Sequence, residues 1–433
     1  MKSDSINYAH NSFLHITYMH PLRSESAQSK TQKSYGITAE NSFRLLLAFL
    51  CLEDTAVKKT GVASLPLHYG KAPKWLVFRM QRLAKEIVTI IINEHGTDDL
   101  LRKISDPFWF QALGCVLGYD WHSSGVTTVV TGVLKSALEP ENHGIAVCGG
   151  KGKVSRQTPL EIDSVGRKFE LSSERIQELK YASKLSAKVD NTAVQAGYHL
   201  YHHAFIVAGD EKWAVVQQGM CLQDRTARRY HWLSENVKDF VVKPHNAIVC
   251  DVRRDVALDM TAEESEGCRE TSLDIAKESP KKTKHLIKSI KPACQKSLQE
   301  WIPGTSTMPW KEHQIDVLSM PRNMNWKALR DVYEFQPPSY EQLLGFKGIG
   351  PATIRGLALI AELIYGEKPC WKDPVEYSFA YGGKDGVPYP VNRKAMDESI
   401  WILEHAVHEA KIGKKDKIRS VQRLKEFTTQ RVT

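Results

Sequence analysis

The chain has 433 residues and a mass of 49.0 kDa, enough for two or three domains and at least one sizeable hydrophobic core. Hydrophobic residues make up 42% of it and charged residues 25%, which excludes collagen-like, mucin-like and wholly disordered proteins. No apolar run reaches the roughly 18 residues that a membrane-spanning helix needs. We therefore expect a cytoplasmic protein with no membrane partner.

The net charge of +9 is concentrated in the last third of the chain. From Ser272 onward there are 26 Lys and Arg against 19 Asp and Glu, or +7, which leaves only +2 for the rest. This asymmetry favours a nucleic-acid-facing part joined to a near-neutral part, although a basic surface also serves solubility alone.

Two helices are expected near the start of the ordered chain, after an extension over 1–57 that we expect to be mobile. Residues 73–95 carry apolar side chains at three- and four-residue steps, and Gly96 follows where a C-terminal cap belongs. Asp106 and Pro107 then have the residue types of an N-cap and a first helical turn.

Further along, the local pattern is clear at some positions and ambiguous at others. Residues 126–134 and 145–148 fit a strand or a buried helix equally well. A helix is expected over about 172–189, with a serine as its cap.

A β-hairpin gives the clearest strand signal in the chain. Two apolar runs flank a short loop that contains Gly209. Pairing Val207 with Trp213 places His203 opposite Gln217 at the open end of the hairpin. A slip of one residue would turn each side chain to the other face.

The stretch 340–355 resembles a helix-hairpin-helix DNA-binding motif, with a short helix capped by Ser339, a Gly-rich turn and a second helix from about Pro351 to Tyr365. Gly348 and Gly350 let the main chain approach a phosphate, to which the first N–H groups of the second helix point. Lys347 and Arg355 add charge. Such contacts carry no base information, so binding should be sequence-tolerant and salt-sensitive. The alternative is a Gly-rich connection between two packed helices.

A second candidate for phosphate contact is the run Gly-Gly-Lys-Gly-Lys at 149–153. It is not a P-loop, because Val154 follows Lys153 where Ser or Thr is required. Lys151 and Lys153 fit a flexible basic loop touching DNA and a plain solvated loop about equally well.

A third candidate combines the open end of the hairpin with the Arg-Arg-Tyr-His-Trp run that follows it. If the protein cleaves phosphodiesters, Asp190, His203 and Gln217 are the first catalytic candidates, with Arg228 and Arg229 holding the phosphate. A divalent Mg or Mn ion would fit this chemistry, but no metal ligands are assigned. The alternative is a set of polar groups on a sheet edge or satisfied in a core.

Several stretches together resemble one protein family. They are Thr60–Gly70, Asp106–Gln111, Asp120–Gly125, Gly149–Lys153, Val215–Met220 and Arg228–Trp232. They are similar to the archaeal and bacterial family called domain of unknown function 763, over about Lys58 to Ile402. The resemblance implies a prokaryotic cytoplasmic protein with an N-terminal domain followed by a helix-hairpin-helix, and it implies no catalytic residue.

The predicted fold class is α+β. We expect a mixed domain with a small antiparallel sheet over 58–271, a Lys-rich linker over 272–310, and an all-helical helix-hairpin-helix domain over 311–433.

The leading functional hypothesis is a protein of DNA repair or processing that binds the phosphate backbone without sequence specificity, with a metal-dependent nuclease as one version. A weaker resemblance is to the helix-hairpin-helix DNA glycosylases, in which Asp373 or Asp385 would act. Ala352 stands where their bifunctional members place a Lys, which disfavours a lyase. A non-enzymatic DNA- or RNA-binding adaptor is the third hypothesis, because a phosphate-cradling hairpin does not test for the 2′-hydroxyl.

Overall fold

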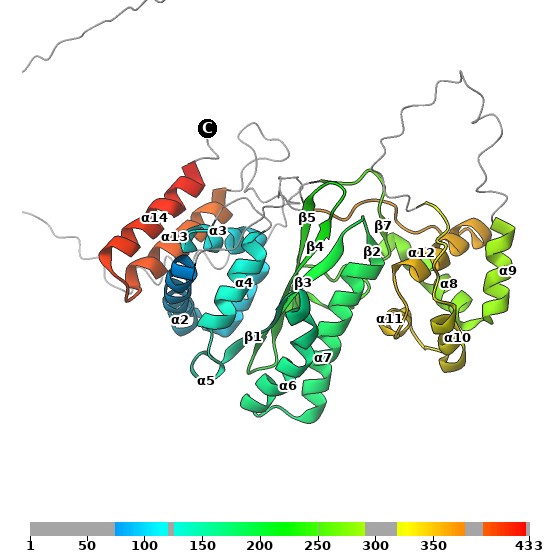
Figure 1. Ribbon diagram of the computed structural model, residues 1–433, viewed down its shortest axis with the longest axis horizontal. Helices are drawn as coiled ribbons and strands as arrows, with labels where there is room; N and C mark the ends of the chain where they lie inside the picture. The colour runs from blue at the N-terminus through cyan, green and yellow to red at the C-terminus, as the bar shows by residue number, and fades with distance from the viewer. Residues whose placement is uncertain (1–73, 120–124, 251, 291–317, 377–392, 430–433) are drawn as a thin grey trace, which may run out of the picture. The chain divides into compact units, whose positions relative to one another are not determined.

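The computed structural model of the protein describes residues 74–119, 125–250, 252–290, 318–376 and 393–429 (Figure 1). These residues belong to one compact unit, Lys58–Thr433. The extension predicted over 1–57 lies outside the described residues. Within the described ranges, none of the helices has the length and apolar character needed to cross a bilayer.

The secondary structure is mixed, with helices before, between and after the strands. The helices are α2 (Lys74–Ser105), α3 (Pro107–Leu117), α4 (Gly125–Ala137), α5 (Pro140–His143), α6 (Thr158–Lys168), α7 (Ser173–Lys188), α8 (Glu266–Lys277), α9 (Pro280–Ile290), α10 (Trp326–Phe335), α11 (Tyr340–Gly345), α12 (Pro351–Ile360), α13 (Arg393–Glu409) and α14 (Lys414–Thr429). The strands are β1 (Ile145–Lys151), β2 (Val194–Gln195), β3 (His199–Ala208), β4 (Trp213–Cys221), β5 (Thr226–Leu233), β6 (Ala247–Cys250) and β7 (Leu258–Asp259).

A five-stranded antiparallel sheet in the order β1-β3-β4-β5-β6 forms the centre of the fold. The hairpin β3–β4 pairs Val207 with Trp213 and His203 with Gln217, so the predicted register is confirmed. The α+β class with a small antiparallel sheet is confirmed as well.

The side chains of β3 alternate between two hydrophobic cores, one on each face of the sheet. Phe205 and Val207 belong to the core that also holds Trp213, whereas Ala204 and Ile206 belong to the other. Successive residues of a strand point to opposite faces, so a single apolar run supplies both cores.

Helices cover both faces of the sheet (Figure 1). On one face α2 and α4 contact the strands, and α3, α13 and α14 pack beside them. On the other face α6 and α7 contact the strands, and α7 also contacts α11. The core on this second face runs from Cys148 to Val375 and crosses the predicted domain boundary at 271. Of the predicted linker, residues 272–290 form the end of α8 and all of α9, which buries Ile287 and Ile290.

The local helix signals read from the sequence have clear counterparts. Gly96 breaks the helical geometry of α2 with φ 84° and ψ 174°. Asp106 caps α3 by accepting hydrogen bonds from the N–H groups of Phe108 and Trp109, at 2.7 and 3.0 Å. The ambiguous stretch 126–134 is helical and lies in α4, whereas 145–148 lies in β1.

A buried ion pair ties the sheet to the segment after α12. Arg228 Nη2 on β5 donates to Asp373 Oδ2 at 2.6 Å, and both side chains are fully buried. The Arg228 guanidinium also lies 4.5 Å from the centre of the Tyr198 ring. This arrangement contradicts the prediction that Arg228 contacts phosphate, and it leaves Asp373 no access to a nucleobase.

We expect Asp373→Ala to lower the free energy of unfolding by about 3–5 kcal/mol, because it leaves the Arg228 charge buried without its counter-ion. Urea denaturation measures this loss. Glu139→Ala breaks a pair with Lys85 in which both side chains are more than two-fifths exposed, and it should change the free energy little. Similar losses in the two variants would contradict the role given to the buried pair.

Candidate functional site

Four polar side chains form a hydrogen-bonded chain between α7 and the sheet. Ser183 Oγ lies 2.8 Å from His203 Nε2, and His203 Nδ1 lies 2.9 Å from Gln217 Oε1. Gln217 Nε2 donates to Asp190 Oδ2 at 2.6 Å. The structure thus brings together the three side chains predicted as catalytic, and it adds Ser183 to them.

The backbone explains why these residues meet. The register of the hairpin places His203 on β3 beside Gln217 on β4. Asp190 lies in η2 (Val189–Ala193), a single π-helical turn that continues α7. Ser183 and Asp190 are therefore about two helical turns apart, on the same face of one continuous helical segment.

The direction of each hydrogen bond follows from the amide of Gln217. Its NH₂ group faces Asp190, because a carboxylate oxygen accepts and does not donate, so its carbonyl accepts from Nδ1–H of His203. With the proton on Nδ1, the Nε2 atom of the neutral ring is an acceptor, and the Ser183 hydroxyl donates to it. Burial lowers the pKa of His203 to about 4, so the ring is neutral at pH 7.

Asp190 is fully buried and anchors the far end of this chain. It also accepts a hydrogen bond from Trp232 Nε1 at 3.1 Å, and its Oδ1 atom lies 2.5 Å from His245 Nε2. Burial raises the pKa of Asp190, and the adjacent His245 lowers it. Sequence reasoning missed His245, which lies in the loop between β5 and β6 and belongs to no motif. It also missed Ser183, although the apolar period of α7 could have placed Ser183 on the buried face.

Ser183 and His203 line a cavity of about 430 Å³ at the start of β3. Arg156, Lys184 and Lys188 line it as well, and no Asp or Glu is among its described lining residues. Burial lowers the pKa of Lys188, and repulsion by Lys184 lowers it further. This basic cavity therefore favours an anion, which would offset the repulsion.

Lys188 connects the basic cavity to the predicted phosphate-binding turn, residues 346–350. Its Nζ donates to the backbone carbonyl of Ile349 and lies 3.4 Å from that of Phe346. Gln195 adds a second connection by donating to the carbonyl of Pro351 at 2.9 Å. Lys188 at the end of α7 thus joins the turn to the cavity, and Gln195 of β2 joins the start of α12 to the strand that follows η2.

The turn itself is exposed at Lys347 and Gly348 and is anchored by Ile349, which is 1% exposed. Gly348 has φ +88°, and a Cβ there would lie 2.9 Å from Asn325 Nδ2. Gly350 has φ −139°, and a Cβ there would meet nothing within 4 Å. Gly348 is therefore required by the fold, whereas the position of Gly350 faces open space.

The helices that flank the turn begin as the sequence predicts. Ser339 Oγ caps α11 by accepting from the N–H of Gln342 at 3.3 Å. α12 starts at Pro351 and continues into a π-helical turn that ends at Tyr365. Arg355 lies on α12 and is half-buried.

The predicted basic loop lies beside the same cavity. Lys151 and Lys153 are exposed at the end of β1 and in η1 (Gly152–Gln157). Lys151 Nζ is 5.9 Å from the ring centre of Tyr201, which lines the cavity.

Arg229 lies elsewhere and is fully buried. Its guanidinium is 4.7 Å from the centre of the Phe110 ring, and its Nη1 donates to Gln111 Oε1 at 3.5 Å. This location contradicts the prediction that Arg229 holds phosphate, because no ligand reaches a side chain with 0% exposure.

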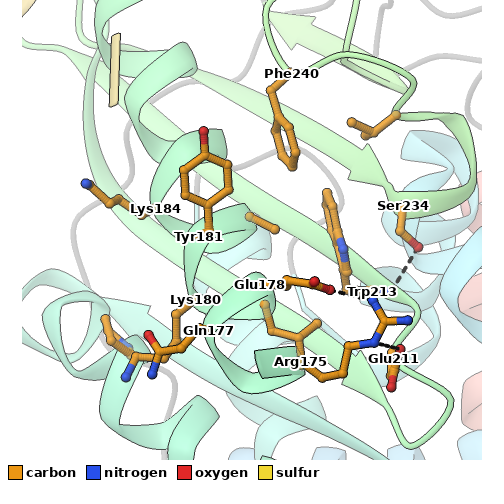
Figure 2. Close-up of a pocket in the computed structure, with 14 residues that line it drawn as sticks. Arg175, Gln177, Glu178, Lys180, Tyr181, Lys184, Glu211, Trp213, Ser234 and Phe240 are labelled. Atoms are coloured by element: carbon orange, nitrogen blue, oxygen red, sulfur yellow. Dashed lines mark hydrogen bonds and ion pairs between the residues drawn. The ribbon is translucent and has the colours of Figure 1, made fainter. Parts of the chain in front are cut away.

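A larger cavity of about 970 Å³ lies between α7 and the tip of the hairpin (Figure 2). Trp213 and Phe240 stack in it at 6.1 Å, with Tyr181 nearby. Arg175 pairs in it with Glu178 at 2.5 Å and with Glu211 at 3.1 Å, and Lys180 and Lys184 line it as well. Glu178 and Glu211 distinguish this cavity from the basic cavity, which has no carboxylate among its described lining residues.

Metal ligands are not evident in the part of the chain that the structure describes. Among those residues there is no group of three or more His, Cys, Asp or Glu side chains suited to holding an ion. His202 and His203 point to opposite faces of the sheet: His202 Nε2 lies 3.0 Å from Thr131 Oγ1, away from the chain that ends at Asp190. Asp385 and residues 120–124 lie outside the described residues.

Comparison with known families identifies the chain. Residues 61–391 match the family described as protein of unknown function, DUF763. The match spans well over half of the chain, so the protein belongs to this family. Neither the curated proteins nor the solved structures contain a match.

We expect the protein to lose stability as the pH falls from about 6.5 toward 4. Burial lowers the pKa of His203 to about 4 and that of His202 to about 3, against 6.5 for an ordinary histidine. In this range the unfolded chain binds protons that the folded chain does not, so acid favours unfolding. Urea unfolding at several pH values measures the slope of the free energy of unfolding against pH. The His203→Gln variant should reduce that slope by the equivalent of about one proton. A free energy of unfolding that is constant between pH 6.5 and 4.5 would contradict the burial of neutral histidines.

Proposed function

We propose that the protein binds the phosphate backbone of DNA without sequence specificity and acts in DNA repair or processing. The observation that carries this proposal is the contact of Lys188 with the carbonyls of the 346–350 turn. Through it, the helix-hairpin-helix-like turn and the basic cavity form one surface on which successive phosphates can lie.

The polarity of the turn supports an anion at its outer side. Lys188 contacts the carbonyls of Phe346 and Ile349, while α12 begins at Pro351 and has the positive end of its dipole at this turn. Lys347 extends from the exposed part of the turn, and Lys151 and Arg156 stand at the opposite end of the surface. A strand crossing this surface meets basic side chains at both ends.

Processing of the bound strand is assigned to the side chains in the basic cavity. Among the three hypotheses, a cleaving enzyme fits best, since His203 lies in the same cavity as the cations. The glycosylase hypothesis loses Asp373 to its pair with Arg228. An RNA backbone offers the same phosphates, so DNA and RNA are compared in the binding experiments.

The two glycines of the turn provide a matched test. Gly350→Ala should weaken binding to a DNA duplex by about tenfold, because the methyl group stands where a phosphate approaches. It should leave the unfolding transition close to that of the wild type, because its Cβ meets no protein atom. Fluorescence anisotropy and urea denaturation measure the two effects.

Gly348→Ala serves as the contrasting variant. It should lower the free energy of unfolding by about 1–2 kcal/mol, because alanine is strained at φ +88°. Equal DNA affinity of Gly350→Ala and the wild type would contradict phosphate binding at the turn.

The basic cavity predicts a charge-dependent affinity. Lys184→Gln should reduce the slope of log affinity against log salt by about one, as expected for one lost phosphate contact. The control is Lys243→Gln, an exposed lysine that pairs with Glu263 and lies outside the cavity. If this slope changed equally in both variants, the affinity for DNA would depend only on the overall charge of the protein and not on the basic cavity.

A further inference from the structure

The Ser183 hydroxyl ends the hydrogen-bonded chain at the wall of the basic cavity. Both Ser183 and His203 line that cavity, whereas Gln217 and Asp190 lie behind them and are fully buried. Each donor in the chain points toward Asp190, so the lone pair of His203 Nε2 faces the Ser183 hydroxyl. Nucleophile, base and orienting group thus stand in the order that nucleophilic catalysis requires.

We propose that Ser183 is a nucleophile and His203 its general base in a site that cleaves phosphate esters, with Gln217 and Asp190 as positioning residues. The proposal rests on the function proposed above for its substrate, which would be a phosphodiester of a bound nucleic-acid strand. It goes further by naming the attacking atom.

The chemical step proceeds through a covalent intermediate. His203 Nε2 takes the proton of Ser183 while Oγ forms a bond to phosphorus and the bond from phosphorus to the leaving oxygen breaks. The leaving oxygen receives the proton from His203. A water molecule then gives a proton to His203 and attacks the phosphoserine, and the proton returns to Oγ as Ser183 is released.

The surroundings suit this reaction in two ways. Arg156, Lys184 and Lys188 bring positive charge to the cavity in which negative charge grows on the phosphoryl oxygens. Burial lowers the pKa of His203 to about 4, so the imidazole is unprotonated at pH 7, and the hydrogen bond from its Nδ1 to Gln217 leaves Nε2 as the atom that accepts the Ser183 proton.

The test uses a reagent that reports an activated serine without any knowledge of the natural substrate. The full-length protein is treated with diisopropyl fluorophosphate, which loses fluoride when a serine oxygen attacks its phosphorus, and the modified peptide is found by mass spectrometry. We expect one modification, at Ser183. Ser183→Ala should show none, and His203→Gln should react at least about 100-fold more slowly.

Ser186→Ala is the matched control, because Ser186 lies on the same helix, is fully buried, and donates to a backbone carbonyl with no histidine beside it. It should be labelled like the wild type. Absence of labelling in the folded wild type, or labelling that persists in Ser183→Ala, would overturn the proposal.

The positioning role of Gln217 has its own readout in the pH profile of labelling. In the wild type the rate should fall as the pH drops through about 4, where His203 becomes protonated. Gln217→Glu places an anion beside the ring and should move the midpoint of this profile upward. A midpoint that stays in place would contradict the positioning role.

The two proposals fail separately. Normal DNA binding without labelling would remove the nucleophile and leave the binding function intact. Labelling at Ser183 without binding to DNA or RNA would remove the nucleic-acid substrate and leave an activated serine.

Discussion

The register of the β3–β4 hairpin is the constraint on which the other features depend. With Val207 opposite Trp213, Phe205 and Val207 of β3 face one core, and Ala204 and Ile206 face the other. The same register turns His203 toward α7 and places it beside Gln217. Since a strand has a period of two, a slip by one residue would turn His203 away from α7 and exchange side chains between the two cores. The packing of both cores therefore holds the candidate site in place.

Because the polar chain at this site is buried, the loss of any one of its side chains would leave a neighbouring polar group without a hydrogen-bond partner. A buried polar group is costly unless a partner satisfies it, and each link from Ser183 to Asp190 has one. The carboxylate of Asp190 is held from three sides, because Trp232 and His245 contact it as well as Gln217. Such a network keeps a fixed geometry, which suits chemistry at its exposed end.

Local features were predictable from the sequence because their causes are local. The cap at Asp106, the cap at Ser339 and the register set by the hairpin all depend on residues near one another in the chain. The burial of Arg228 and Arg229 was not predictable, since arginines interleaved with aromatic residues look the same on a nucleic-acid surface and in a core with cation–π contacts. The partner of Arg228 lies 145 positions away, and no local pattern indicates it.

Hydrogen exchange of the backbone amides in the presence of duplex DNA at low salt tests the central claim most directly, because it follows the N–H groups that would hold the phosphates. We expect slower exchange in residues 347–353 and, through the contact of Lys188, in 183–191, with little change in α13 and α14. Unchanged exchange in the 346–350 turn at saturating DNA would contradict the account.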